Sequence, residues 1–268
     1  MIKNKKYNAR LATLLLAVCS LFLLAGCQQE EQAPDMTAGR PTLNILFVGN
    51  ESTFLNHMPY MVQLMAQTDP TAHFKIDLQM HVTQSASLAQ LWHNPATRDI
   101  LTSKSWDYII IQPHNMWAAT EGSVYLTRKS ISAWSSQIKQ VKAQPVLFMT
   151  WPLEPSHSAY TDPNNPALKN YKNMHRLIRG YSKALAQEMD LIVSPIGDYW
   201  MAASMTAPEI ELYSPDRSSP SLAGSYFTAL VLYKTLVNIS LDNVTYIPEG
   251  ITQEAKDKMI NIVSRKIK

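Results

Sequence analysis

The chain has 268 residues, 46% of them hydrophobic, which is enough to bury one good-sized core in a single domain. It carries 24 basic and 21 acidic residues, a net charge of +3, but four of the basic residues and none of the acidic ones fall in the first 26 positions. Without that segment, 20 basic residues stand against 21 acidic ones, a net charge of −1. The charge therefore gives no support to a nucleic-acid partner.

The first 26 residues have the pattern of a targeting segment. A basic start precedes an apolar stretch at 11–25, which is short for a membrane span. The sequence then reads Leu-Ala-Gly-Cys at 24–27, which resembles the lipobox of bacterial lipoproteins, where the cysteine is lipidated and becomes the new N-terminus. An ordinary signal peptide or a lone anchor helix is the alternative. The resemblance implies an exported chain, anchored by a lipid on Cys27 in the cell envelope and facing the periplasm. Gln28 resembles the outer-membrane sorting pattern rather than the inner-membrane one.

The two cysteines are Cys19, within the targeting segment, and Cys27, the expected lipid site. The processed domain would have no thiol for a disulfide, a cysteine-based metal site or thiol catalysis. Residues 27–42 are polar and contain two prolines, which predicts a flexible tether. The folded domain is expected to span 43–268.

Short apolar runs alternate with helical patterns from residue 43 onward. The run at 74–83 alternates apolar and polar residues and suits an outer strand, whereas 107–112 and 145–151 are continuously apolar, as in strands buried on both faces. Strands are also predicted at 44–49 and, more weakly, at 191–196. Helices are predicted near 58–68, 86–103, 123–142, 167–189, 221–238 and 251–267. This alternation predicts an α/β fold, a three-layer sandwich doubly wound around a mostly parallel five-stranded sheet.

Ligands of such sheets bind beyond the carboxyl ends of the strands. The loops that matter follow Gly49, Thr83, Gln112 and Trp151, together with the late loop around Asp216.

These loops carry five stretches that, in this order, resemble the blocks of the SGNH (GDSL-like) hydrolase superfamily. They are "ILFVGNESTFLNHMP" (45–59), "SASLAQLW" (85–92), "WDYIIIQ" (106–112), "VLFMTWP" (146–152) and "LYSPDRSSPSLAGSYFTALVLY" (212–233), and the resemblance covers about 43–238. It implies five parallel strands in flavodoxin-like order and a shallow active site. It also implies a serine that attacks an ester, a histidine that takes its proton, an aspartate that orients the histidine, and oxyanion donors from the second and third blocks.

The residues that carry this chemistry depart from the family pattern. The family serine directly follows Gly-Asn, but here Glu51 follows Gly49 and Asn50, and Ser52 is displaced by one residue. In the last block Asp216 is present, whereas Ser219 occupies the place of the histidine. Both proton-transfer partners are therefore missing from their expected positions.

The oxyanion donors are also altered. Ser85 stands where the family has glycine, although its backbone N–H remains available. Gln112 is retained in the third block, and we expect Asn115 to supply the polar donor there, with His114 as its neighbour.

Three roles are open for Glu51. It could bind a ligand or stabilise the start of a helix, or it could pair with Asp216 as acid and base on a sugar. Alternatively, Ser52 is the nucleophile and takes its base from elsewhere, because an unassisted hydroxyl is a poor nucleophile at neutral pH. His114 and His157 lie in loops at the expected site and are the only plausible substitutes, unless they are simply exposed. The remaining histidines are expected on the surface by the second strand (His73, His81), in helices (His93, His175) and at the start of the first helix (His57).

Aromatic residues near these loops give one further indication. Trp117, Trp151, Tyr160 and Trp200 could stack on sugar rings, or they could belong to the core. The proline-rich stretch at 150–171 is expected to be a long loop over the strand ends.

The sequence thus predicts an envelope lipoprotein whose domain binds a small-molecule ligand, a carbohydrate or acylated molecule, at a catalytically degenerate site. The alternative is an active serine esterase or carbohydrate deacetylase that uses Ser52, Asp216 and a rearranged base. A partner-docking lipoprotein is a third class, and it would carry a large exposed apolar patch. We expect no metal, since no histidine spacing fits a metal site, and no cofactor or nucleic acid. The oligomeric state stays open.

Overall fold

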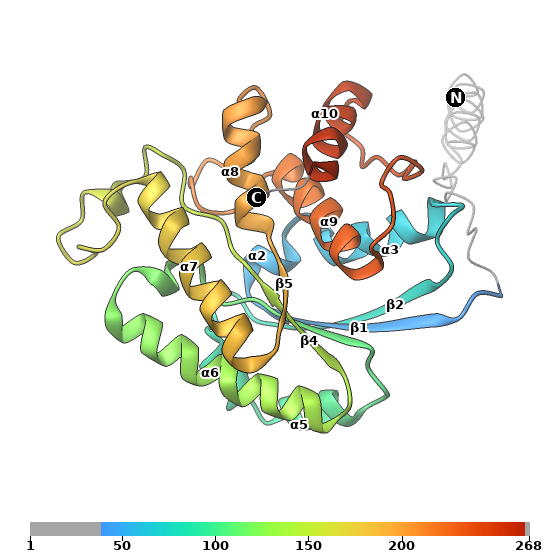
Figure 1. Cartoon of the computed structure of the whole chain (residues 1–268), viewed down its shortest axis with the longest axis horizontal. Coiled ribbons are helices and arrows are strands. Elements are labelled where there is room, and N and C mark those ends of the chain that lie inside the picture. Colours follow the sequence, from blue (N-terminus) through green and yellow to red (C-terminus); the bar gives the residue numbers. More distant parts are fainter. Residues whose placement is uncertain (1–38, 266–268) are drawn as a thin grey trace, which may run out of the picture. The chain divides into compact units, whose positions relative to one another are not determined.

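A computed structural model describes residues 39–265, which form an α/β domain around one five-stranded sheet (Figure 1). All strand pairs are parallel, and the strand order is β2-β1-β3-β4-β5. The predicted sheet and its flavodoxin-like order are therefore confirmed. The strands are β1 (Thr42–Gly49), β2 (Lys75–Val82), β3 (Tyr108–Ile111), β4 (Gln144–Phe148) and β5 (Ile192–Ser194).

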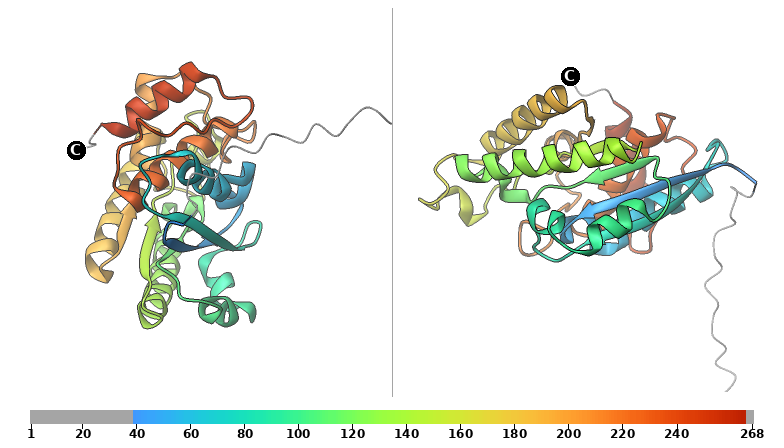
Figure 2. Two further views of the ribbon diagram at one scale, coloured as in Figure 1. Left: turned by 90° about the vertical axis from the view of Figure 1, so that its right-hand side faces the viewer. Right: turned by 90° about the horizontal axis from the view of Figure 1, so that it is seen from below.

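Helices cover both faces of the sheet, as Figures 1 and 2 show. Because successive side chains of a strand point to opposite faces, β1 contributes Ile45 and Phe47 to one core and Leu46 and Val48 to the other. The first core is completed by α3 (Met58–Thr68), α8 (Ile196–Thr206), α9 (Leu222–Val237) and α10 (Gln253–Ser264). The second is completed by α4 (Leu88–Trp92), α5 (Ala96–Thr102), α6 (Glu121–Gln140) and α7 (Tyr171–Met189).

Two predicted elements are shorter than expected because of proline. The strand predicted at 191–196 ends at Ser194, since Pro195 has no N–H to continue the ladder. The helix predicted at 86–103 is divided into α4 and α5, and Pro95 stands between them.

No sequence pattern indicated α8. This helix is buried on most sides and has no polar stripe, so helical periodicity is weak. Its first turn carries the buried Asp198, which accepts hydrogen bonds from His175 Nε2 (2.7 Å) and Arg179 Nε (3.1 Å) on α7. Burial raises the pKa of Asp198, but the hydrogen bonds and charges of His175 and Arg179 outweigh it and hold the pKa below 3.8.

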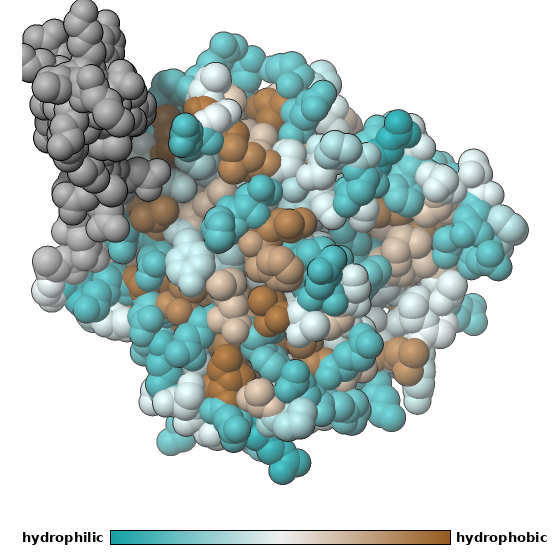
Figure 3. Space-filling model, turned by 180° about the vertical axis from the view of Figure 1, so that it is seen from behind, coloured by the Kyte–Doolittle hydropathy of each residue, from teal (hydrophilic) through white to brown (hydrophobic). Residues whose placement is uncertain are grey.

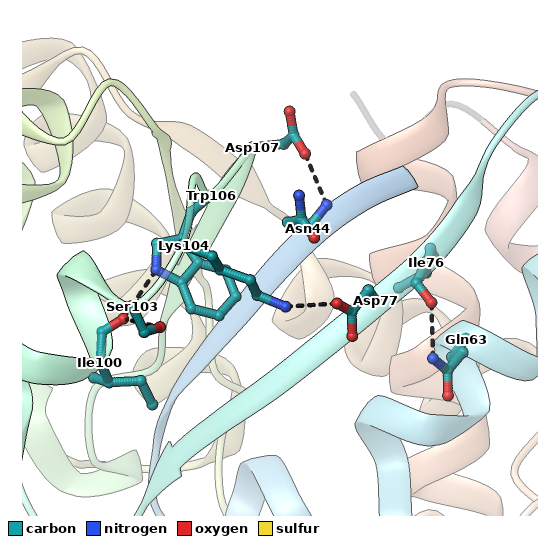
Figure 4. A network of polar contacts seen from close by, with 9 residues as sticks. All are labelled: Asn44, Gln63, Ile76, Asp77, Ile100, Ser103, Lys104, Trp106 and Asp107. Atoms are coloured by element: carbon teal, nitrogen blue, oxygen red, sulfur yellow. Dashed lines mark hydrogen bonds and ion pairs between the residues drawn. The ribbon is translucent and has the colours of Figure 1, made fainter. Parts of the chain in front are cut away.

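A polar network ties the amino-terminal halves of β1 and β2 to the loop before β3 (Figure 4). Asp107, just before β3, accepts a hydrogen bond from the backbone N–H of Asn44 on β1 at 2.7 Å. Lys104 forms an ion pair with Asp77 on β2 at 2.7 Å and lies 4.6 Å from the ring centroid of Trp106. These contacts hold the loop before β3 against the amino-terminal halves of β1 and β2. They lie away from the carboxyl ends of the strands, where ligands of such sheets bind.

Between residues 39 and 265, no helix is both long enough and apolar enough to cross a bilayer. Cys27 and most of the expected tether lie outside the described residues, and β1 begins at Thr42, next to the expected start of the domain.

Two glycines within helices provide a matched test of this packing. A Cβ on Gly224 in α9 would lie 2.1 Å from the carbonyl oxygen of Leu212, whereas nothing lies within 4 Å of one on Gly180 in α7. Gly224→Ala should lower the free energy of unfolding by about 1–3 kcal/mol through overpacking. Gly180→Ala should raise it by about 0.5–1 kcal/mol because alanine favours the helix. Urea denaturation of both variants checks the pair, and equal effects would contradict the packing of α9.

Candidate functional site

The site is built on the turn between β1 and α2 (Glu51–Phe54), at the carboxyl edge of the sheet. The buried side-chain oxygen of Gln112, just after β3, accepts hydrogen bonds from the Asn50 backbone N–H (2.9 Å) and the Thr53 hydroxyl (3.0 Å). The Asn50 side chain caps α2 by accepting from the Ser52 N–H at 3.1 Å. A Cβ on Gly49 would lie 2.5 Å from both Gln112 Oε1 and Thr53 Oγ1, so only glycine fits this turn. Gly49, Asn50 and Gln112 therefore hold the backbone of the turn in place.

Glu51 is the first residue of α2 and reaches the next loop of the sheet. Its carboxylate accepts a hydrogen bond of 2.5 Å from the backbone N–H of Ser85, in the loop after β2. Ser85 has φ 57°, in the left-handed region that glycine adopts most easily. The loop thus keeps a glycine-like backbone, and its N–H points to a protein carboxylate.

Ser52 faces the interior. Only 3% of its surface is exposed, and its hydroxyl donates to Asn115 Oδ1 at 3.3 Å. Within residues 39–265, no hydrogen bond joins this hydroxyl to a histidine or a carboxylate. Ser52 therefore lacks the contact with a base that a nucleophile needs.

Asp216 folds back on its own loop. Its Oδ1 accepts from the backbone N–H groups of Ser218 (2.9 Å) and Ser219 (2.8 Å). Partial burial raises the pKa of Asp216, but these hydrogen bonds, one from the Ser219 side chain and the charge of His157 outweigh it, so the pKa lies below 3.8. Asp216 and Ser219 form one local unit in which the carboxylate orders a loop.

Asn115 joins the first and last blocks. It accepts from Ser52, and its amide donates to the carbonyl oxygen of Ser218 at 3.5 Å. The indole N–H of Trp151 donates to the same carbonyl at 3.0 Å. The structure therefore brings Ser52, Asn115 and the Asp216 loop together, as the order of the blocks predicts, but through structural hydrogen bonds.

The two loop histidines act as caps of short helical turns. His114 Nδ1 accepts from the N–H of Met116 at 3.1 Å, and His157 Nδ1 accepts from the N–H of Ala159 at 3.0 Å. His157 also lies near enough to Asp216 to lower its pKa. Neither histidine is hydrogen-bonded to Ser52, so neither replaces the family base in this arrangement.

Some sequence expectations about exposure are wrong. His81 was expected on the surface, but it is buried, its Nε2 lies 2.9 Å from the Thr97 hydroxyl, and burial lowers its pKa. Trp151 was a candidate ligand contact, yet it is fully buried and stacks on Trp200 with ring centroids 4.1 Å apart. Trp117 is also buried, so all three tryptophans belong to the core. The half-buried Tyr160 donates its hydroxyl to the carbonyl of Leu153.

A small apolar cavity opens beside this site, and the sequence did not indicate it. Its volume is about 250 Å³. His114 lines it, next in the chain to Asn115, and so does Leu126, an exposed residue of α6. The other main apolar lining residues are Leu88, Ala89, Pro113, Met116 and Trp117. They come from three separate segments, so no local pattern could have revealed them.

The described residues contain no group of three histidine, cysteine, aspartate or glutamate side chains that could hold a metal ion. The turn between β1 and α2 presents the half-buried Glu51 carboxylate at the carboxyl edge of the sheet. The apolar cavity lies beside it.

Comparison with known proteins bears on the fold. The chain is similar to a protein from Slackia heliotrinireducens assigned to the SGNH hydrolases, with 26% identity, a TM-score of 0.61, and coverage of 73% of this chain and 99% of that one. A DUF4886 family protein from Bacteroides uniformis shares 15% identity at a TM-score of 0.63, covering 83% of this chain and 93% of that one. An acetyl xylan esterase shares 11% identity at a TM-score of 0.55, covering 73% and 100%. No protein-family model and no curated protein matches the chain.

The domain therefore has the SGNH-hydrolase-like fold, that of esterases and GDSL-like lipases. Within this fold the chain is one whose first block carries Glu51 and whose last block carries Ser219.

The Asp216 loop makes the stability of the domain depend on pH. Since folding lowers the pKa of Asp216, its contribution is present above 3.8 and is lost as the pH falls through the folded-state value. Asp216→Asn keeps an oxygen acceptor but cannot titrate, so it should reduce the difference in unfolding free energy between pH 7 and pH 3. Chemical denaturation at the two pH values measures this. Asp99→Asn, on the exposed face of α5, is the control and should leave the difference in place.

Proposed function

We propose that this chain binds an acylated carbohydrate at the old SGNH active site and does not hydrolyse it. The observation that carries the proposal is the hydrogen bond from the Ser85 N–H to the Glu51 carboxylate.

That hydrogen bond works against ester hydrolysis. In SGNH hydrolases, as the resemblance implies, the backbone N–H at the Ser85 position stabilises the negative oxygen that forms during attack on an ester. Here the donor is already used by a carboxylate, and a second negative oxygen beside Glu51 would be repelled. Ser52 points inward without a base, and Ser219 cannot take up a proton as histidine does. Nucleophile, base and oxyanion stabilisation are thus all compromised.

The same geometry favours a neutral ligand rich in hydroxyl groups. A carboxylate only accepts hydrogen bonds, and sugar hydroxyls donate them. The apolar cavity next to His114 would take the acyl group. Its volume of about 250 Å³ lies below the usual 300–1,000 Å³ of small-molecule sites, which favours a short acyl chain such as acetyl. One of the structural neighbours is an acetyl xylan esterase, which fits this class of ligand.

A partner-docking role receives less support. On the face drawn in Figure 3, hydrophobic side chains are scattered among hydrophilic ones and form no single broad patch. The large exposed apolar residues in the described part of the chain are few and dispersed: Tyr60, Tyr125, Leu126, Ile192 and Met205.

Two measurements on the purified protein test the proposal. The wild type, Ser52→Ala and Glu51→Ser should all fail to hydrolyse p-nitrophenyl acetate and butyrate above the buffer rate, because even a serine at 51 would lack a base. Acetylated xylotriose should bind more tightly than unacetylated xylotriose by calorimetry. Glu51→Gln should weaken this binding about tenfold, since hydrogen bonds to a charged acceptor are stronger. Glu249→Gln, an exposed glutamate elsewhere, should have no effect.

Turnover by the wild type that disappears in Ser52→Ala would overturn the proposal in favour of the active esterase. Equal affinity for acetylated and unacetylated xylotriose would show that the site does not recognise the acyl group.

We also propose that the domain works in the bacterial cell envelope, held at the membrane by a lipid on Cys27 and facing the periplasm. The support is the Leu-Ala-Gly-Cys pattern at 24–27 after a basic and apolar leader, and Gln28 favours the outer membrane.

Cys27→Ser should abolish incorporation of radiolabelled palmitate into the chain expressed in a Gram-negative host, and it should move the protein from the membrane fraction to the soluble fraction or leave it unprocessed. Cys19→Ser is the matched control, because that cysteine lies inside the leader, and it should be labelled like the wild type. Labelling of Cys27→Ser would contradict the assignment.

A further inference from the structure

A second and larger cavity lies on the helical layer formed by α4, α5 and α6. Its volume is about 620 Å³, within the range of small-molecule sites. The residues that matter are Trp92, His93 and Asn94 at the end of α4, Arg98 on α5 and Gln137 on α6. It shares no lining residue with the apolar cavity beside the old active site, so it forms a separate concave surface.

The polar side chains of this cavity are free to bind a ligand. Among residues 39–265, the side chains of His93, Arg98 and Gln137 make no hydrogen bond or ion pair with another residue. Asn94 uses only its oxygen, which accepts from the Ala96 N–H at 3.0 Å. Four side chains with N–H donors thus line one cavity, and their donors have no protein acceptor.

The wall of the cavity is fixed by the core beneath it. Trp92 packs against the buried Trp134, with centroids 5.3 Å apart and rings at 73°. The buried Thr97 hydroxyl, also in the lining, is hydrogen-bonded to the carbonyl of Leu91 and lies 2.9 Å from His81 Nε2. These buried contacts fix the aromatic and backbone wall of the cavity, whereas the side chains of His93, Arg98 and Gln137 would be ordered by the ligand.

The charge of the lining defines the ligand. Arg98 is the one permanently charged side chain in the lining, and no aspartate or glutamate lines the cavity. A guanidinium pairs best with a planar carboxylate, which it can bind through two parallel hydrogen bonds. The single positive charge of Arg98 matches a ligand group with one negative charge. A phosphate dianion would need a second positive charge. Trp92 supplies an aromatic surface for a sugar ring, and Asn94 and Gln137 supply partners for hydroxyl groups.

We propose that this cavity is a second binding site, specific for an acidic sugar of the uronate class, with Arg98 on the carboxylate and Trp92 against the ring. The domain would then hold two carbohydrate sites of opposite character. The acidic turn at Glu51 selects neutral hydroxyl donors, and the acid-free cavity selects a sugar carboxylate.

Calorimetry with trigalacturonic acid and with its methyl ester tests this proposal on the full chain. The two probes have the same rings and differ in charge. The acid should bind at least tenfold more tightly than the ester, and the difference should shrink in 1 M salt because the charge is exposed. Arg98→Gln should lower affinity for the acid about tenfold and leave affinity for the ester unchanged. Since Arg98 is exposed, this variant should fold normally.

Two control variants and one further variant of the lining keep the result specific. Arg176→Gln removes an exposed arginine of α7 outside the cavity and should bind the acid like the wild type. Gln137→Ala should weaken both probes by a smaller factor, because it removes a neutral contact. Glu249→Gln, at an exposed glutamate that lines neither cavity, should change neither affinity. Equal affinity for acid and ester, an unaltered Arg98→Gln variant, or no heat of binding at millimolar acid would each overturn the proposal.

Discussion

The geometry of the candidate site depends on the hydrogen bonds of the buried Gln112 amide. Its oxygen accepts from the Asn50 N–H and the Thr53 hydroxyl, and so fixes the turn from β1 into α2 to the end of β3. Gly49 permits this approach because it has no side chain to collide with the amide. An unmade hydrogen bond in this dry place would cost about 1–3 kcal/mol for each orphaned group. The direction in which Glu51 and Ser52 leave the turn follows from this constraint.

The turn points the side chains of Glu51 and Ser52 in different directions. Glu51 points along the sheet edge to the Ser85 N–H, while Ser52 points inward to Asn115. A serine in the place of Glu51 would stand at that edge, which is where the family resemblance puts the nucleophile. The displacement of the hydroxyl by one residue therefore changes both its exposure and its partners. In this chain the edge position carries a carboxylate that the Ser85 N–H holds in place.

The last block also forms structural hydrogen bonds. Asp216 would orient a histidine in the family, but here it bonds to the backbone and side chain of Ser219 and orders its own loop. Ser218 then anchors this loop through its carbonyl to Asn115 and Trp151. The hydrogen bonds of Asp216 stabilise the loop itself. This arrangement supports the proposed binding role.

The sequence by itself determined the sheet and its order and the position of most helices, and it predicted that Glu51 and Ser219 stand in the places of the family serine and histidine. Those features are local: apolar runs mark buried strands, and an aligned block needs only neighbouring residues. The tertiary structure decided the rest. It alone showed that Glu51 meets Ser85, that Trp151 and His81 are buried, that α8 is a helix, and that Trp92, Arg98 and Gln137 line one cavity. These facts depend on which segments pack against one another, and a side chain's partners across a sheet or between helices leave no periodic trace in the chain.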